Sequence, residues 1–175
     1  LFRDHDYFLN LGGISNLSSG NLAFDVSPCN MVLNRLAGMV DENCKYDENG
    51  MMARGGEVKT DLLEALNALP YYQQRPPKSL GSEWVNESFW PALSAFPYEP
   101  VDKMRTVVEH VAFQIGECFR RMKSEPGTLL ITGGGFLNIF LRERITQASS
   151  MYGVDVDQDV AREVVEFKEA LIFAF

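Results

Sequence analysis

The sequence predicts an α/β fold in which strands and helices alternate along the chain. Residues 7–24 consist of short apolar and aromatic runs separated by glycine and asparagine, which is typical of antiparallel strands. Residues 101–123 repeat apolar side chains at intervals of three and four, as an amphipathic helix does. Residues 128–132 form an apolar run that precedes three glycines and a further helical segment, which indicates a buried strand.

The first third of the chain predicts a β-meander followed by two helices. We expect strands at 7–11, 14–18 and 22–24, because Gly12-Gly13 and Ser19-Gly20-Asn21 interrupt the apolar runs. Asn30 is a suitable cap for a helix over 31–40. Residues 41–56 are polar and predict a loop. A second helix is expected over 57–69, where Pro70 ends it.

The remaining elements alternate in the same way. Residues 71–100 predict an ordered, irregular connector with a short helix around 83–90, because their many aromatic side chains argue against disorder. The long helix over 101–123 ends before Pro126-Gly127. Further elements are expected in the order helix, strand and final helix, at 137–148, 152–156 and 167–175.

Composition excludes several classes of function. A net charge of −8 disfavours binding to a phosphate backbone, so we expect no nucleic-acid partner. The apolar runs are too short for a bilayer-spanning helix, and no signal peptide precedes the first strand, so we expect no membrane partner. The three cysteines lack CxxC spacing, which predicts reduced cytoplasmic thiols and no metal site. His110 lies off the apolar stripe and is expected on the helix surface.

Three short motifs carry candidate chemistry, and each has a structural alternative. Gly12-Gly13 lets backbone N–H groups approach an anion, but it also suits an ordinary β-turn. Gly133-Gly134-Gly135 lies between a strand and a helix, where it suits a nucleotide or a simple tight turn. Asp25 ends a strand before Pro28, so it could act as a general base or as a turn residue. The triple glycine matches neither a dinucleotide fingerprint nor a Walker loop.

These motifs occur in an order that resembles the anhydro-N-acetylmuramic acid kinase family of the actin-like ATPase superfamily. The resembling segments are Asn10–Ser18 (NIGGIANLS in the family), Phe24–Asn34 (FDTGPGNMLMD), Tyr46–Gly50 (YDKDG), 70–72 with 76–83 (PYF and PPKSTGRE), Ile131–Asn138 (VCGGGxxN) and 168–175 (KEALAFAW). The chain departs from these patterns at Ser27, Cys29, Leu80 and Ser82. The Gly-Thr-Ser-x-Asp-Gly phosphate loop that begins family members does not occur here.

The resemblance implies a fold and a reaction. The fold is a ribonuclease-H-like lobe, a mixed sheet flanked by helices, and residues 1–175 would be the C-terminal lobe of a two-lobed kinase. Together with an N-terminal lobe, it would use ATP and Mg²⁺ to open 1,6-anhydro-N-acetylmuramic acid hydrolytically and to phosphorylate O6. The resemblance further implies a cytoplasmic enzyme of peptidoglycan recycling, often a homodimer, whose isolated lobe is inactive.

The resemblance also implies roles for individual residues. Asp25 would be the general base that activates water. Gly12, Gly13 and Asn16 would form a phosphate-contacting hairpin. The residues of the adenosine platform would be Gly133, Gly134, Gly135 and Asn138. Glu169 is a candidate for sugar or nucleotide contact, with a solvated helical glutamate as the alternative.

Two functions of other classes stay open at this point. One is a nucleotide-binding lobe of a chaperone-like or regulatory actin-family protein that has no sugar substrate. The other is a catalytically inactive interaction domain that retains the fold, which the departures at Ser27, Cys29 and Ser82 favour.

Overall fold

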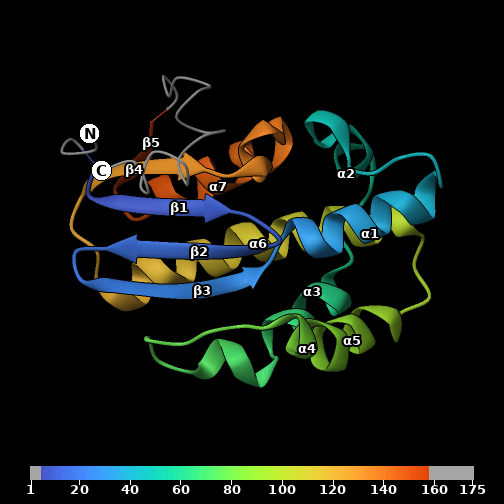
Figure 1. Ribbon diagram of the computed structural model, residues 1–175, viewed down its shortest axis with the longest axis horizontal. Helices are drawn as coiled ribbons and strands as arrows, with labels where there is room; N and C mark the ends of the chain where they lie inside the picture. The colour runs from blue at the N-terminus through green and yellow to red at the C-terminus, as the bar shows by residue number, and fades with distance from the viewer. Residues whose placement is uncertain (1–4, 158–175) are drawn as a thin grey trace, which may run out of the picture.

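A five-stranded mixed sheet forms the centre of the computed structural model, which describes residues 5–157 (Figure 1). Its strands are β1 Tyr7–Leu11, β2 Ile14–Ser19, β3 Leu22–Pro28, β4 Gly127–Thr132 and β5 Val154–Val156, in the spatial order β3-β2-β1-β4-β5. The meander β1-β2-β3 is antiparallel, whereas β1, β4 and β5 are mutually parallel. The predicted α/β class and mixed sheet are therefore confirmed. The predicted final helix at 167–175 and Glu169 lie outside the described residues.

The sheet buries one apolar face against the long helix α6, Pro100–Met122. Leu9, Leu17 and Phe24 alternate with half-exposed neighbours along the first three strands, as a sheet with one packed face requires. Figure 1 shows α6 running behind the sheet, with α7, Ile139–Ser150, beside it. Pro100 occupies the first turn of α6, and Lys123 ends the helix in the left-handed conformation at φ 50°.

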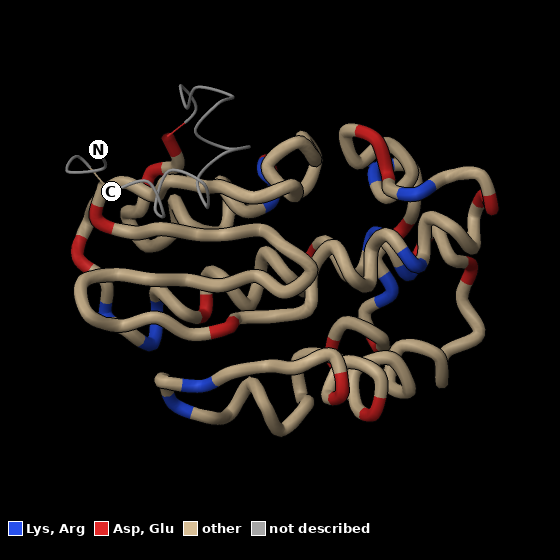
Figure 2. Tube along the Cα trace, in the orientation of Figure 1, with Lys and Arg blue, Asp and Glu red and all other residues tan. Residues whose placement is uncertain are grey.

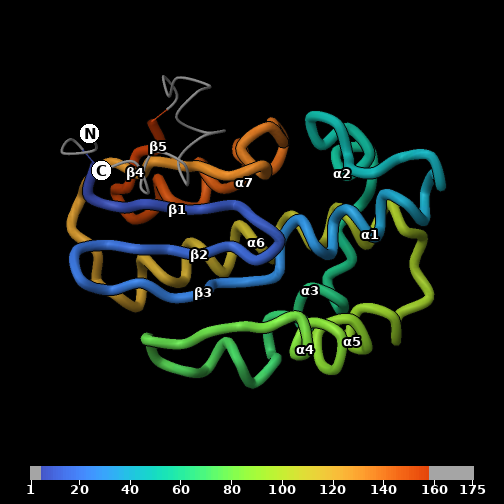
Figure 3. The backbone as a smooth tube through the Cα atoms, in the orientation of Figure 1, coloured from blue at the N-terminus to red at the C-terminus, as the bar shows by residue number. Residues whose placement is uncertain are grey.

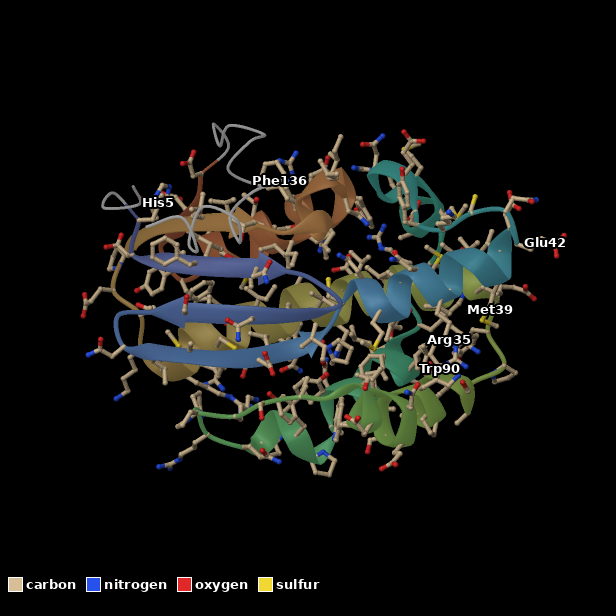
Figure 4. All side chains as sticks on the ribbon, in the orientation of Figure 1. His5, Arg35, Met39, Glu42, Trp90 and Phe136 are labelled. Carbon is tan, nitrogen blue, oxygen red and sulfur yellow. The ribbon has the colours of Figure 1, made fainter. Side chains whose placement is uncertain are left out.

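The other helices form a second group beyond one end of the sheet (Figure 3). They comprise α1 Asn30–Val40, α2 Met51–Gly55, α3 Thr60–Asn67, α4 Ser82–Trp84, the π-helical turn η3 Val85–Phe89 and α5 Trp90–Ser94. The 3-10 turns η1, η2 and η4 span Glu48–Gly50, Pro70–Gln73 and Gly134–Leu137. The side chains of Arg35 on α1 and Trp90 on α5 point toward each other (Figure 4), with the guanidinium carbon 3.6 Å from the ring centroid. Within residues 5–157, no helix combines the length and hydrophobicity needed to cross a bilayer.

Two expectations for residues 30–56 were wrong. Residues 41–56 contain η1 and α2 as well as loop, because the buried Asp47 carboxylate accepts hydrogen bonds from the backbone N–H groups of Met52 and Ala53 at 2.8 and 2.9 Å. Those bonds satisfy donors at the start of α2. Asn30 is the first residue of α1 rather than its cap, and its side-chain amide donates to the carbonyl oxygen of Leu11 at 3.0 Å.

His110 is buried in α6, which corrects its expected position on the helix surface. The Asn67 oxygen Oδ1 accepts from Gln114 Nε2 at 2.9 Å, so His110 Nδ1–H donates to the same oxygen at 2.7 Å. His110 Nε2 then accepts from the hydroxyl of Tyr72 at 2.8 Å. Burial lowers the pKa of His110 to about 3, so the ring stays neutral.

We predict that His110 makes stability depend on pH. Its pKa is near 6.5 in the unfolded chain and about 3 in the fold, so only the unfolded state takes up this proton between those values. The contribution of His110 to the free energy of unfolding is fully present above pH 6.5. As the pH falls from 6.5 toward 3, this contribution decreases by up to about 1.4 kcal/mol per pH unit. Urea unfolding between pH 7 and pH 4 measures the slope.

The control is His110→Gln, which removes the titrating ring and keeps polar atoms at the site. The carboxylates contribute equally to both proteins, so their effect cancels in the difference between slopes. Equal pH slopes for wild type and His110→Gln would show that His110 is not held neutral in the fold.

Candidate functional site

Polar side chains form a row across four neighbouring strands near the end of the sheet from which α1 starts. The strand register pairs Thr132 with Asn10, Asn10 with Asn16, and Asn16 with Asp25. Asn10, Asn16 and Asp25 are half-exposed, whereas the flanking Leu9, Leu17 and Phe24 are buried on the α6 side. The row therefore lies on the face of the sheet turned away from α6.

Asp25 is held at both carboxylate oxygens. Asn16 Nδ2 donates to Oδ1 at 3.0 Å, and the backbone N–H of Leu80 donates to Oδ2 at 2.8 Å. An ionised carboxylate has about four acceptor positions. Each oxygen therefore retains a lone pair that can accept a proton. The two predicted site residues Asn16 and Asp25 are brought together here, although the sequence placed them in different roles.

A segment from the connector fixes the backbone of Asp25 as well. We call residues 70–81 the strap, because they run along the outer edge of β3. Lys78 O accepts from Asp25 N–H at 3.1 Å, and the Tyr71 hydroxyl donates to Asp25 O at 2.6 Å. Sequence reasoning missed these contacts, because no local pattern in residues 70–81 marks a partner some fifty residues away.

The Gly12-Gly13 turn directs its carbonyl oxygens at the first residues of α1. Gly13 O accepts from the N–H groups of Cys29 and Met31 at 2.9 and 3.2 Å, and Gly12 O accepts from Asn30 N–H at 3.2 Å. These donors would otherwise be unsatisfied at a helix start. The turn therefore caps α1, and this part of the helix terminus is not open to an anion.

The triple-glycine loop packs against the end of β1. Gly133 has φ +83°, and a Cβ there would lie 2.3 Å from Asn10 Oδ1. A Cβ on Gly135 would lie 2.6 Å from Leu11 Cβ. At Gly134, by contrast, Asn30 Nδ2 at 3.9 Å is the nearest atom that such a Cβ would meet. Gly133 and Gly135 therefore have to be glycine because the end of β1 lies so close to them, whereas Gly134 has room for a side chain.

Gly134 and Gly135 line a cavity of about 650 Å³. Asn138, which caps α7 by accepting from Leu141 N–H at 2.9 Å, also lines it. The opposite walls come from Asn30 and Asn34 of α1 and from residues 46–49. Of the predicted site residues that the structure describes, five do not line this cavity: Gly12, Gly13, Asn16, Asp25 and Gly133. The predicted site therefore divides into two parts, the cavity and the polar row.

Residues 46–49 are functional candidates that sequence reasoning did not assign. Their signal was the Tyr-Asp-x-x-Gly pattern, in which Gly50 has φ +75°. A Cβ on Gly50 would lie 2.3 Å from Asn138 Oδ1, so the glycine lets this segment close against the start of α7. The cavity wall therefore depends on Gly50. The sequence shows this glycine, but it does not show that the glycine packs against Asn138.

Phe136 supplies an aromatic side chain at the rim of the same cavity (Figure 4). The guanidinium carbon of Arg142 lies 4.1 Å from its ring centroid, and burial lowers the pKa of Arg142. A glycine floor, amide side chains and an aromatic rim suit a planar, polar ligand of nucleotide size.

Residues for a magnesium ion are sparse in this half-site. Residues 5–157 contain no cluster of three histidine, cysteine or acidic side chains. Of the acidic residues at the cavity, Asp47 already accepts two backbone hydrogen bonds. Protein-bound Mg²⁺ commonly keeps water and phosphate ligands and uses one or two carboxylates. The described residues therefore supply no dedicated metal cage at this cavity.

Comparison with known sequences identifies close similarity to one family. The family model described as anhydro-N-acetylmuramic acid kinase matches residues 2–175. The proteins of that name from Idiomarina loihiensis and Coxiella burnetii are 32% and 31% identical to this chain. The alignments cover 95% and 100% of this chain but 47% and 50% of those proteins. The chain thus spans about half the length of the curated relatives that it matches.

A solved structure shares the fold. The activator of the 2-hydroxyisocaproyl-CoA dehydratase from Clostridium difficile, solved with bound ADPNP, aligns with a TM-score of 0.52 at 13% identity. The alignment covers 99% of this chain and 64% of that one. At this identity the likeness concerns the fold alone, and it agrees with the predicted α/β fold of a mixed sheet flanked by helices.

We predict that the three adjacent glycines differ sharply in their tolerance of alanine. Gly133→Ala combines a positive φ with a contact far shorter than van der Waals distance, so it should lower the free energy of unfolding by about 2 kcal/mol or more. Gly134→Ala meets open space and should stay within about 0.5 kcal/mol of wild type. Urea unfolding of the two variants provides the comparison, and equal losses would show that the loop does not approach β1.

Proposed function

The chain belongs to the anhydro-N-acetylmuramic acid kinase family, and from this premise we propose that it forms the C-terminal lobe of an ATP-dependent sugar kinase. The reaction would open the 1,6-anhydro bridge of anhydro-N-acetylmuramic acid and place a phosphoryl group on O6. The observation that carries the proposal is the carboxylate of Asp25, which Asn16 and Leu80 orient from both sides on the face away from α6.

Asp25 would act as the general base. Its carboxylate takes a proton from water while the water oxygen bonds to the anomeric carbon, and the bond from that carbon to O6 breaks. O6 leaves with the electron pair and attacks the γ-phosphorus of ATP, so that ADP departs. Fixed orientation matters because proton transfer requires a base within hydrogen-bond reach of the proton.

The cavity at Gly134 and Gly135 would hold the adenosine part of ATP. Support comes from its volume of about 650 Å³, its glycine floor and the aromatic rim at Phe136. Mg²⁺ would neutralise charge on the phosphates when bound. Because the chain spans about half the length of the relatives that it matches, an N-terminal lobe would complete the site, and a cytoplasmic location would give access to ATP. This lobe alone would be inactive.

We predict that Asp25→Asn lowers turnover by a factor of about 10² or more, because the amide cannot accept the proton of the attacking water. The native protein that contains this sequence is incubated with ATP, Mg²⁺ and 1,6-anhydro-N-acetylmuramic acid, and the assay measures the rate of ADP release. Asp155→Asn, an identical change at an exposed position on β5, serves as the matched control.

The outcomes separate two ideas. Turnover by wild type but equal turnover by Asp25→Asn would remove Asp25 from the role of base and leave the kinase assignment. Nucleotide binding by wild type without any response to the sugar would instead favour a regulatory nucleotide-binding lobe.

We also predict that Gly134→Leu weakens ADP binding by about tenfold or more, because the side chain would extend into the cavity. Stability should change little, since a Cβ at this position meets open space. Calorimetric titration with ADP measures the effect, and Gly55→Leu, at the exposed end of α2 where a Cβ meets no atom within 4 Å, is the control for a leucine added elsewhere. Unchanged ADP affinity in Gly134→Leu would place the adenosine in another part of the protein.

A further inference from the structure

A second cavity, of about 760 Å³, lies on the other side of β3 from the Asp25 carboxylate. Its floor is apolar and comes from Leu22, Phe24 and Val26 of β3. One wall is the strap from Tyr72 to Lys78, and the other is the last three turns of α6. Among the described residues, the lining of this cavity and that of the glycine-lined cavity have no member in common.

Positive charge gathers in this cavity, although the chain as a whole is acidic at −8. Among the described lining residues the basic side chains are Arg75, Lys78, Arg120, Arg121 and Lys123, and the acidic one is Glu117. Figure 2 shows the basic segments of the strap and of the α6 end at the same end of the molecule. The strap and α6 are in direct contact there, because Arg121 Nη1 donates to Tyr72 O.

One carboxylate cannot neutralise these cations. Glu117 binds Arg120 through both oxygens at 2.7 Å and lies 3.4 Å from Arg121 Nε. Within residues 5–157, Arg75, Lys78 and Lys123 make no ion pair with a carboxylate. The ammonium of Lys78 donates to Tyr71 O at 3.3 Å and lies 4.2 Å from the Tyr71 ring centroid. Burial lowers the pKa of Lys78, and the charge of Arg121 acts in the same direction.

The structural alternative explains part of this cluster. Basic residues at a helix C-terminus interact favourably with the carbonyl end of the helix dipole, which accounts for Arg120, Arg121 and Lys123. It does not account for Arg75 and Lys78, which the strap brings from a distant part of the sequence. Holding these two cations beside three others costs repulsion that a bound anion would relieve.

We propose that this cavity binds a small organic anion that carries an apolar group, such as an aryl or acyl phosphate or carboxylate. The cations would contact the anionic group, and the β3 floor would cover the apolar part. A volume of about 760 Å³ suits a small molecule. A polyanion such as nucleic acid would meet the repulsion of the remaining acidic surface. The proposal does not depend on the sugar kinase reaction.

The site is placed to affect Asp25. Lys78 directs its side chain into this cavity, while its carbonyl oxygen accepts from Asp25 N–H at 3.1 Å. Two residues later, Leu80 N–H donates to the Asp25 carboxylate. An anion on one side of the strap therefore contacts the segment that orients the carboxylate on the other side.

Phenyl phosphate is the probe for the test, with inorganic phosphate as the probe that lacks an apolar group. Met122 lines the cavity, so its ¹³C-labelled methyl group, assigned through Met122→Leu, reports binding locally by NMR. We expect a saturable shift, with phenyl phosphate binding about tenfold more tightly than inorganic phosphate. ADP at saturation holds the nucleotide site occupied during a second titration, in which the affinity should not change.

Arg75→Gln with Lys78→Gln should raise the Kd for phenyl phosphate about tenfold or more. Lys103→Gln, at the opposite end of α6, makes the same kind of charge change away from the cavity and should alter Kd by less than about twofold. Arg75→Gln alone, at an exposed position, keeps the test decisive if the double variant does not fold. No shift at Met122, equal weakening by Lys103→Gln, no preference for phenyl phosphate, or loss of binding in ADP would each overturn the proposal.

Discussion

The fold depends on the backbone at the end of β1, where the carbonyl oxygens of three successive residues serve as acceptors for the start of α1. Leu11 O accepts from the Asn30 side chain, and Gly12 O and Gly13 O accept from backbone N–H groups of residues 29–31. The triple-glycine loop closes on the same place, with Gly135 against Leu11. One strand end thus positions the meander, the first helix and the loop after β4, and with them both parts of the candidate site.

Under the proposed function, the glycine-lined cavity takes the adenosine part of ATP and not its phosphates. Its described lining contains no lysine or arginine, and its charged side chains are the acidic Asp47 and Glu48 beside amide side chains and backbone. Backbone and amide groups can bind polar ligands without net charge, provided that they are fixed in position. Gly133, Gly135 and Gly50 supply that fixation by allowing approaches that a Cβ would block.

Sequence patterns predicted the strands, the long helix and the glycine loop, because each depends on local periodicity or on glycine and proline. These patterns gave the wrong position for His110, because the surface assignment rested on a helix that packs through one apolar face only. α6 packs against the sheet on one side and receives Asn67 of α3 and Tyr72 of the strap on another. Asp25 was predicted at the end of a strand over 22–24, but β3 continues to Pro28, so Asp25 lies inside the strand. Its partners Tyr71 and Leu80 depend on where the strap folds back, which no local pattern encodes.

The departures from the family pattern also gain a physical explanation. Ser27 replaces a family glycine, yet its side chain points into the core, where Oγ donates to Pro28 O at 3.1 Å and lies 3.3 Å from the Tyr72 hydroxyl. Since that hydroxyl donates its own hydrogen to His110, it can only accept here, and Pro28 O and the Tyr72 hydroxyl share the single hydroxyl hydrogen of Ser27. Cys29 is fully buried, and burial raises the pKa of its thiol to about 12, so it stays a neutral core residue. Ser27 is accommodated against Tyr72 and Cys29 within the core, which weakens the case that these two substitutions mark a catalytically inactive domain.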